Sequence, residues 1–249
     1  LDYIEALKFL AQRANIPFPE DGVDDRASRL RTRILELNRE TARFFHQCLI
    51  SPGGKTAWDY LIQRGRTPKI IRRFGLGYSL KTPDDLYRYM RSKGYGDGIL
   101  KETGLFYIEE RGSRDKFWNR VMFPIMDANS RVVGFGGRVM GEGNPKYLNS
   151  PETKIFDKSR NLYGLNFARA SRRPNFILCE GYLDVISMHQ AGFTNAVASL
   201  GTAFTSPHAS LIKRYTDEVL LAYDSDDAGV RAALRAIPIL KEAGLKSKV

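Results

Sequence analysis

The sequence predicts an α/β protein in which a mixed α+β N-terminal subdomain precedes a parallel βαβ sheet. Three observations predict this class. From residue 176 onward, short apolar runs alternate with segments of helical length, which is typical of right-handed βαβ units. Residues 105–140 contain closely spaced strand-like runs joined by turns. The residues before them carry apolar side chains at helical spacing.

The N-terminal part is expected to be mainly helical. Residues 1–14 read as an amphipathic helix that ends at the turn-forming sequence NIPFPEDG, within a lead-in or linker over residues 1–20. The next helix should place its exposed arginines opposite an apolar stripe. The helices expected after the lead-in are residues 25–50, 55–64, 68–74, 83–93 and 98–102.

Strand-like runs dominate residues 105–140. The runs LFYI, RVMFPIMD and RVVGFGGRVM alternate with predicted turns at Arg111-Gly112 and at residues 128–130. The glycines of GFGGR have the wrong spacing for a dinucleotide fingerprint, so they indicate a bulge or a close approach to the backbone. Residues 141–153 are predicted to form a long polar loop, and long loops in compact domains often serve a function.

The last third of the chain is expected to form the parallel sheet. The runs NFILC and EVLLAY are short and apolar, as strands covered on both faces are. NAVASLG fits a third strand, and KSKV fits the start of another. These patterns divide the chain into a linker (1–20), a basic subdomain (21–175) and a sheet subdomain (176–249) that we expect to be incomplete at its C-terminal end.

Carboxylates directly follow two of the predicted strands. Glu180 ends one strand, and Asp224 and Asp226 follow the other. Ligands bind at the carboxyl ends of strands in an open α/β sheet, so these side chains are expected to converge. Crowded carboxylates repel one another unless a cation neutralises them, and Mg²⁺ prefers such oxygen ligands. The alternative is that Asp226 or Asp227 only caps a helix beginning near Ala228; the carboxylate on a second strand favours the metal.

Positive charge is concentrated in the first part of the chain. The net charge is +11, and residues 1–175 hold 32 Lys and Arg against 20 Asp and Glu. Residues 176–249 hold 7 against 8 and are nearly neutral. A basic platform joined to an acidic pocket suits a polyanion that is held by one part and reacts at the other.

Composition excludes several classes of protein. No apolar run approaches the roughly 20 residues that span a bilayer, and the N-terminus lacks a signal-peptide pattern, so we expect a cytosolic protein. Cys48 and Cys179 are predicted to be buried thiols. These two cysteines and the three scattered histidines (His46, His189 and His208) cannot supply a zinc-ligand framework.

Longer motifs surround the carboxylates. The stretches EGYLDVISMHQAGFTNAVASLGTAFT and YDSDDAG contain them, and FGGRVM followed by PKYLNSPET lies upstream. In these motifs the chain resembles the RNA polymerase core of bacterial DnaG-type DNA primases, which is built on the Toprim fold. The upstream pair looks like the basic signature specific to primases. The resemblance covers nearly the whole chain, whereas the Glu and the Asp-x-Asp alone would also fit topoisomerases and Toprim nucleases.

The resemblance implies roles for individual residues. Glu180, Asp224 and Asp226 would hold catalytic Mg²⁺ or Mn²⁺, two or more ions in all, with Asp184 beside them in the catalytic group. The remaining candidates would contact template or nucleotide: Arg138, Lys146, Tyr147, Asn149 and Lys158, with Arg64 and Arg120 as weaker candidates that could equally be surface charges.

The resemblance also implies a function and partners. It implies synthesis of short RNA primers on single-stranded DNA from NTPs, with an RNA–DNA hybrid as product, in the bacterial cytoplasm at the replisome. The family's zinc-binding domain would lie upstream of this chain, its third acidic motif beyond Val249, and its contact with the replicative helicase in a further C-terminal region.

Two other functions remain open. A Toprim nuclease would use the same carboxylates and metal to direct water at a phosphodiester. A nucleic-acid-binding fragment with little turnover would bind in a salt-dependent and metal-independent way. The FGGR and PKYLNSPET segments favour the primase over the nuclease.

Overall fold

A computed structural model of the chain describes residues 3–14, 16, 22–110 and 112–249. The chain forms two compact units, Leu1–Arg33 and Ile34–Val249. The first contains α1 (Tyr3–Arg13) and the beginning of α2 (Gly22–Ile50), which continues into the second. The expected helix at the start of the chain is therefore present, while the expected linker boundary at residue 20 lies outside the described residues.

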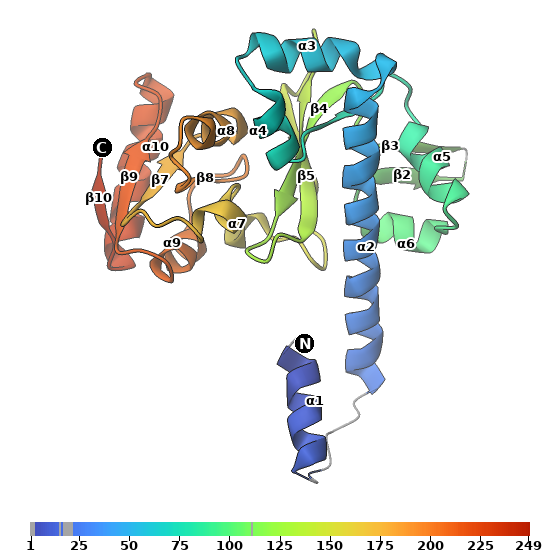
Figure 1. Ribbon diagram of the computed structural model, residues 1–249, viewed down its shortest axis with the longest axis horizontal. Helices are drawn as coiled ribbons and strands as arrows, with labels where there is room; N and C mark the ends of the chain where they lie inside the picture. The colour runs from blue at the N-terminus through green and yellow to red at the C-terminus, as the bar shows by residue number, and fades with distance from the viewer. Residues whose placement is uncertain (1–2, 15, 17–21, 111) are drawn as a thin grey trace. The chain divides into compact units, whose positions relative to one another are not determined.

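Helices and antiparallel strands make up the N-terminal part of the second unit (Figure 1). The helices are η1 (Pro52–Gly54), α3 (Lys55–Gln63), α4 (Pro68–Arg73), α5 (Asp85–Ser92) and α6 (Asp97–Glu102). One sheet has the order β1-β4-β5-β6 and the other is the pair β2-β3. The strands are β1 (Gly77–Ser79), β2 (Phe106–Glu109), β3 (Gly112–Asp115), β4 (Arg120–Met126), β5 (Val132–Val139) and β6 (Tyr147–Asn149).

The predicted helices are present within a few residues of their expected ends, but three short strands depart from the predictions. Tyr147–Asn149 pairs with residues 136–138 of β5, so the expected loop contains an edge strand. Gly112 was expected in a turn and instead begins β3; the other turn residue lies outside the described part. Strand β1 is only three residues long and lies between helices, which left no alternating pattern to detect.

The C-terminal part forms the expected parallel sheet, in the order β10-β9-β7-β8. Its strands are β7 (Phe176–Cys179), β8 (Ala196–Ala198), β9 (Glu218–Ala222) and β10 (Lys246–Lys248), and all three pairings are parallel. The helices are α8 (Tyr182–Gln190), α9 (Ser206–Lys213) and α10 (Asp227–Glu242), preceded by η2 (Lys158–Arg160) and α7 (Leu165–Ala168).

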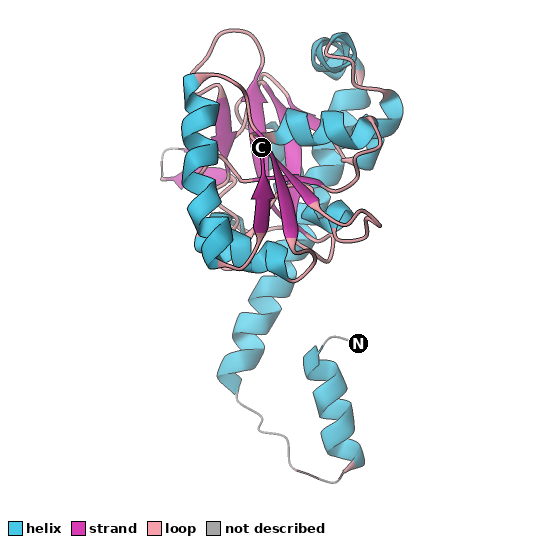
Figure 2. Cartoon of the chain, turned by 90° about the vertical axis from the view of Figure 1, so that its left-hand side faces the viewer, coloured by secondary structure: helices cyan, strands magenta, loops and turns pink. Residues whose placement is uncertain are grey.

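Helices cover both faces of this sheet (Figure 2). Phe176 and Leu178 of β7 belong to the core formed with α9 and α10. Ile177 and Cys179 point the other way, into the core that contains α8 and the strands of the N-terminal sheet. The connections that leave β7 and β9 therefore run over opposite faces. Between two such strands an α/β sheet has its ligand-binding crevice, at their carboxyl ends.

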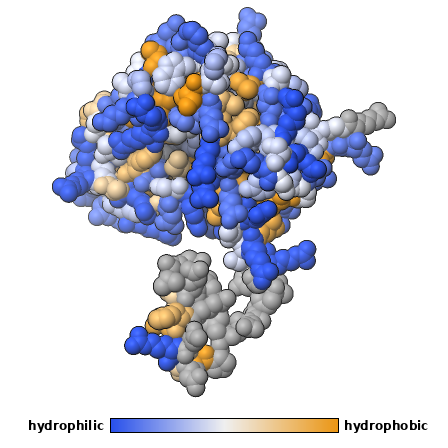
Figure 3. Space-filling model, turned by 45° about the vertical axis from the view of Figure 1, so that its right-hand side comes forward, coloured by the Kyte–Doolittle hydropathy of each residue, from blue (hydrophilic) through white to orange (hydrophobic). Residues whose placement is uncertain are grey.

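The face shown in Figure 3 is mostly hydrophilic, with apolar residues in small patches. Within the described ranges, no helix combines the length and apolar character needed to cross a bilayer. Both cysteines are buried and free, as predicted.

Asp115 at the end of β3 makes stability depend on pH. Its carboxylate accepts hydrogen bonds from the backbone N–H groups of Leu86 (2.8 Å) and Tyr87 (2.9 Å) at the start of α5. Burial raises the pKa of Asp115 from 3.8 to about 7, and repulsion from Asp85 and Asp84 adds to the effect. Between these two values the folded state keeps a proton that the unfolded state has lost, so this contribution to stability falls as pH rises.

We therefore expect the free energy of unfolding of the native chain, relative to Asp115→Asn, to fall by about 2 kcal/mol between about pH 5 and pH 8. Urea denaturation of both proteins at the two pH values measures this difference. The subtraction removes the slopes of all other titrating groups. An unchanged difference would show that Asp115 ionises at the same pH in both states.

Candidate functional site

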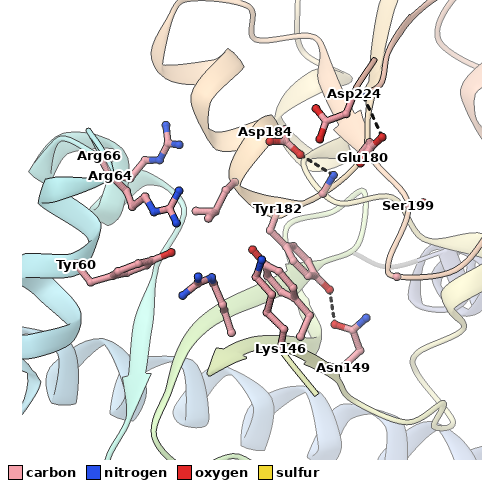
Figure 4. A pocket seen from close by; sticks show the side chains of 15 residues that line it. Tyr60, Arg64, Arg66, Lys146, Asn149, Glu180, Tyr182, Asp184, Ser199 and Asp224 are labelled. Carbon is pink, nitrogen blue, oxygen red and sulfur yellow. Dashed lines mark hydrogen bonds between the residues drawn. The ribbon is translucent and has the colours of Figure 1, made fainter. Parts of the chain in front are cut away.

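A pocket of about 560 Å³ lies at the carboxyl ends of β7 and β9 (Figure 4). One wall is acidic and comes from the ends of these strands and the first turn of α8. The facing wall is basic and aromatic and comes from α3, the α3–α4 loop, β5 and β6. Eight of the predicted site residues line this pocket: Arg64, Arg138, Lys146, Tyr147, Asn149, Glu180, Asp184 and Asp224.

Glu180 and Asp224 are in direct contact across neighbouring strand ends. The Glu180 Oε1 atom accepts a hydrogen bond of 3.0 Å from the backbone N–H of Asp224. Gly229 in the first turn of α10 makes room for this contact, because a Cβ there would lie 2.6 Å from Glu180 Oε1 and 2.1 Å from the Asp224 carbonyl oxygen. The glycine of the DSDDAG sequence is thus required by the close packing behind the acidic wall.

Asp184 lies on the same wall, in the first turn of α8. Its Oδ2 atom accepts a hydrogen bond of 3.0 Å from the backbone N–H of Gly181. Burial raises the pKa of Asp184, and repulsion from Asp224 raises it further, while the Gly181 hydrogen bond and attraction to Arg66 oppose the rise. Asp184 and Asp224 are therefore close enough to repel each other, whereas Glu180, Asp224 and Asp226, which were expected to crowd together, do not form a group of three among the described residues.

Asp226 departs from the expectation that it belongs to the acidic wall. It is the N-cap of α10, and its Oδ1 atom accepts hydrogen bonds from the backbone N–H groups of Ala228 (3.0 Å) and Gly229 (2.8 Å). It does not line the pocket. The helix-cap alternative thus describes Asp226 in this structure, because its carboxylate satisfies two N–H groups at the helix start that have no partner within the helix.

The basic wall is organised around Tyr60 of α3. The guanidinium carbon of Arg138 lies 4.6 Å from the centre of the Tyr60 ring, and that of Arg64 lies 5.6 Å from it. The ring therefore holds two arginines from distant parts of the chain beside one another by cation–π attraction. Lys146, directly before β6, and Tyr147, at its start, continue this wall, and burial raises the pKa of the Tyr147 hydroxyl.

Tyr182 connects the two walls. Its ring stacks on Phe123 of β4 at 5.0 Å, with 9° between the planes. Its hydroxyl donates a 2.6 Å hydrogen bond to Asn149 Oδ1, and the Asn149 Nδ2 atom donates to the Leu200 carbonyl oxygen at 2.8 Å. Asn149 therefore links β6 to the parallel sheet, and both its amide oxygen and its amide nitrogen are already hydrogen-bonded.

Two predicted contact residues lie outside the pocket. Arg120 is 7% exposed, and its Nη1 atom donates to the carbonyl oxygens of Gly137 (3.2 Å) and Pro145 (3.0 Å). This buried position supports the backbone of β5 and the loop after it, so the expected contact with template is not supported. Lys158 lies in η2, where its carbonyl oxygen pairs with Nε2 of the buried His208 at 2.8 Å.

Sequence reasoning missed five side chains of the pocket. Tyr182 and Leu183 lie between the predicted Glu180 and Asp184, and the others are Tyr60, Arg66 and Ser199. Tyr60 lies one helical turn before Arg64, and Arg66 follows Arg64 by two residues, so proximity to a candidate was the available signal. Ser199 follows β8 directly, at the same edge of the sheet as the carboxylates.

The acidic wall fits a hard divalent cation in part. Outside the backbone hydrogen bonds described above, Glu180 and Asp184 each retain one carboxylate oxygen, and Asp224 retains both. However, no three carboxylate, histidine or cysteine side chains of the described residues converge closely enough to hold a metal by themselves. One or two carboxylates completed by water and phosphate is the arrangement that Mg²⁺ commonly takes in nucleotide sites.

Comparison with known families supports the resemblance seen in the sequence. The family model described as DNA primase catalytic core, N-terminal domain matches residues 44–169, just over half of the chain. The chain belongs to the DNA primase catalytic core family. A second model, described as Toprim-like, matches residues 177–249, which contain the parallel sheet of this primase core.

Curated relatives and solved structures of primases agree. The DNA primase of Clostridium acetobutylicum is 45% identical over 251 residues, which cover 99% of this chain and 42% of that protein. The DNA primase of Escherichia coli K12 is 39% identical over 243 residues, covering 95% and 42%. The chain thus spans about two fifths of the length of these curated primases.

Two solved primase structures share the fold. A DnaG primase catalytic domain bound to ssDNA superposes with a TM-score of 0.78 at 40% identity, over 84% of this chain and 67% of that one. The Aquifex aeolicus primase, solved with its zinc-binding and RNA polymerase domains, gives a TM-score of 0.80 at 33% identity, over 99% and 60%.

Proposed function

We propose that the complete protein is a DNA primase, which makes short RNA primers on single-stranded DNA from NTPs, and that this chain supplies its metal and nucleotide pocket. The observation that carries the proposal is the opposition of Glu180, Asp184 and Asp224 to a wall of arginine, lysine and tyrosine in one pocket. Nucleotidyl transfer needs both walls, one to hold cations and the other to hold phosphates.

The basic wall binds and orients the triphosphate. Arg138 and Lys146 provide fixed positive charge, and the stack on Tyr60 limits the freedom of the Arg138 side chain before the nucleotide arrives. Preorganised donors of this kind act more strongly than mobile ones, because less entropy is lost on binding. Tyr147 beside Lys146 offers a ring for stacking or a hydroxyl for a phosphate.

The acidic wall would hold the cations that the reaction needs. Glu180 and Asp224 would bind Mg²⁺ or Mn²⁺, and the ion would supply activation of the attacking hydroxyl and neutralisation of charge on the leaving pyrophosphate. A 3′-oxygen attacks the α-phosphorus while the bond to pyrophosphate breaks. Asp184, whose pKa is raised, is the carboxylate best suited to accept the hydroxyl proton.

A second group of basic and aromatic residues suits the template strand. Tyr107 on β2 has the charged groups of Arg114 and Lys116 over its ring, at 4.8 Å and 5.2 Å, and Trp118 nearby in sequence is 54% exposed. Exposed rings beside cations bind single strands by stacking and charge. The ssDNA-bound primase domain described above supports the same substrate class.

Ribonucleotide incorporation tests the proposal. The full-length protein, given NTPs, Mg²⁺ and single-stranded DNA, should produce labelled RNA that disappears when template or Mg²⁺ is omitted. Shortening of the DNA without NTPs would instead indicate a nuclease, and salt-dependent DNA binding with no product would indicate a binding module. The same assay on residues 1–249 shows whether this part turns over alone. The zinc domain, the helicase contact and the location at the replisome belong to the proposal for the whole protein.

A further inference from the structure

Arg66 is a cation in the wall of the pocket that forms no ion pair with any residue the structure describes. It lies in the α3–α4 loop next to Arg64 (Figure 4). Its Nε atom is buried and has no hydrogen-bond partner among the described residues. Burial lowers the pKa of Arg66, and attraction to Asp184 opposes that change. The side chain as a whole is half-buried, so this Nε–H is the part of the guanidinium that has lost water without gaining an acceptor. An unsatisfied buried donor is costly, which indicates that a ligand completes its hydrogen bond.

Gln190 fixes the backbone on both sides of Arg66. Its Oε1 atom accepts hydrogen bonds from the Thr67 N–H (2.9 Å) and the Thr67 hydroxyl (3.2 Å). Its Nε2 atom donates to the Gly65 carbonyl oxygen at 2.7 Å. Gly65 has φ +76°, a left-handed conformation that ends α3 and turns the chain toward Arg66. One amide side chain therefore holds the loop at three points.

The same helix positions the acidic wall. Gln190 is the last residue of α8, and Asp184 lies in the first turn of that helix. Helix α8 thus sets the loop of Arg66 and the carboxylate of Asp184 at a fixed separation. One oxygen of Asp184 already accepts the Gly181 N–H, and no ion pair joins Asp184 to Arg66 among the described residues, so Asp184 does not satisfy the guanidinium.

We propose that Arg66 binds a phosphate group in the pocket and that Gln190 is the positioning residue that holds Arg66 there. The proposal rests on the proposed function, in which this phosphate belongs to the incoming nucleotide. The planar guanidinium offers two parallel donors to phosphate oxygens, so a phosphate would supply the acceptor that the Arg66 Nε–H lacks.

Binding of inorganic tripolyphosphate in the presence of a chelator tests Arg66 without metal or chemistry. Arg66→Gln in the full chain should raise the Kd about tenfold, as expected for the loss of one charge-assisted hydrogen bond. Arg72→Gln, which removes an exposed arginine of α4 outside the pocket, should change it less than about twofold by the same arithmetic. Equal Kd values for the two variants would overturn the assignment, and would mean that Arg66 only balances Asp184.

A double-mutant cycle tests Gln190. Gln190→Leu should raise the Kd about threefold or more in the native background and leave it unchanged when Arg66 is already Gln. An equal loss in both backgrounds would show that Gln190 has only a general structural role.

Primer synthesis by the native full-length protein is measured in parallel. If RNA is made and Arg66→Gln binds tripolyphosphate normally, the inference fails while the function stands. If no RNA is made and Arg66→Gln still loses tripolyphosphate, the function fails while the inference stands.

Discussion

Replacing Glu180 by Gln in the full-length protein should lower the rate of RNA synthesis by about 10²- to 10³-fold, the range found when one preorganised electrostatic group is removed from an active site. Gln keeps an amide oxygen that can accept the Asp224 N–H bonded to Glu180 Oε1, so the local backbone should be retained. What is lost is the negative charge that a divalent cation needs. The effect should therefore fall on catalysis, with single-stranded DNA affinity nearly unchanged.

Glu242→Gln provides the matched control. Glu242 is exposed at the far end of α10 and lies outside the pocket, so its loss of charge should leave the rate unchanged. Both variants are assayed over a range of Mg²⁺ and Mn²⁺ concentrations. Native rates for Glu180→Gln at all of them would remove Glu180 from the metal site and leave Asp184 and Asp224 as its candidates.

The strands of the parallel sheet could be predicted because their burial on both faces is visible in the sequence itself. Strands buried on both faces appear as short apolar runs, and β7 and β9 each match such a run within one residue. Strands β1 and β6 have no such pattern, because each is three residues long and is defined by pairing with β4 or β5. Strands β8 and β10 are equally short, but the alternation of strands and helices along the chain locates them, whereas β1 and β6 are not part of such an alternation.

The candidate site was predicted unevenly for a related reason. Glu180 and Asp224 could be placed because strand ends converge by topology. Asp226 lies two residues beyond Asp224, and its carboxylate caps the N-terminus of α10 instead of lining the pocket. Arg120 of β4 and Arg138 of β5 lie on neighbouring strands of the same sheet. Arg120 is nevertheless buried against backbone carbonyl oxygens, whereas Arg138 reaches the Tyr60 ring. Only side-chain surroundings separate the two arginines, and these come from packing.

The sequence predicted a close approach to the backbone at the glycines of GFGGR, but it did not identify the side chain that approaches. Close approach to the backbone was expected there, and the structure confirms it at Gly136. A Cβ at this position would lie 2.6 Å from Tyr182 Cζ and 2.7 Å from its hydroxyl oxygen. The Tyr182 ring cannot retreat, because Phe123 stacks on it at 5.0 Å and Tyr163 packs edge-on at 4.7 Å.

Gly136→Ala should therefore destabilise the chain by about 1–3 kcal/mol, the usual cost of overpacking a filled core. Gly98→Ala is the matched control: Gly98 lies in α6 with nothing within 4 Å of an added Cβ, so this variant should be neutral or slightly stabilising. Urea denaturation measures both. Because the displaced Tyr182 also releases Asn149, Gly136→Ala should in addition weaken nucleotide binding under conditions where the protein remains folded. Equal stability of the two variants would mean that β5 and α8 do not pack together in solution, and the pocket would then lack the contact that joins its acidic and basic walls.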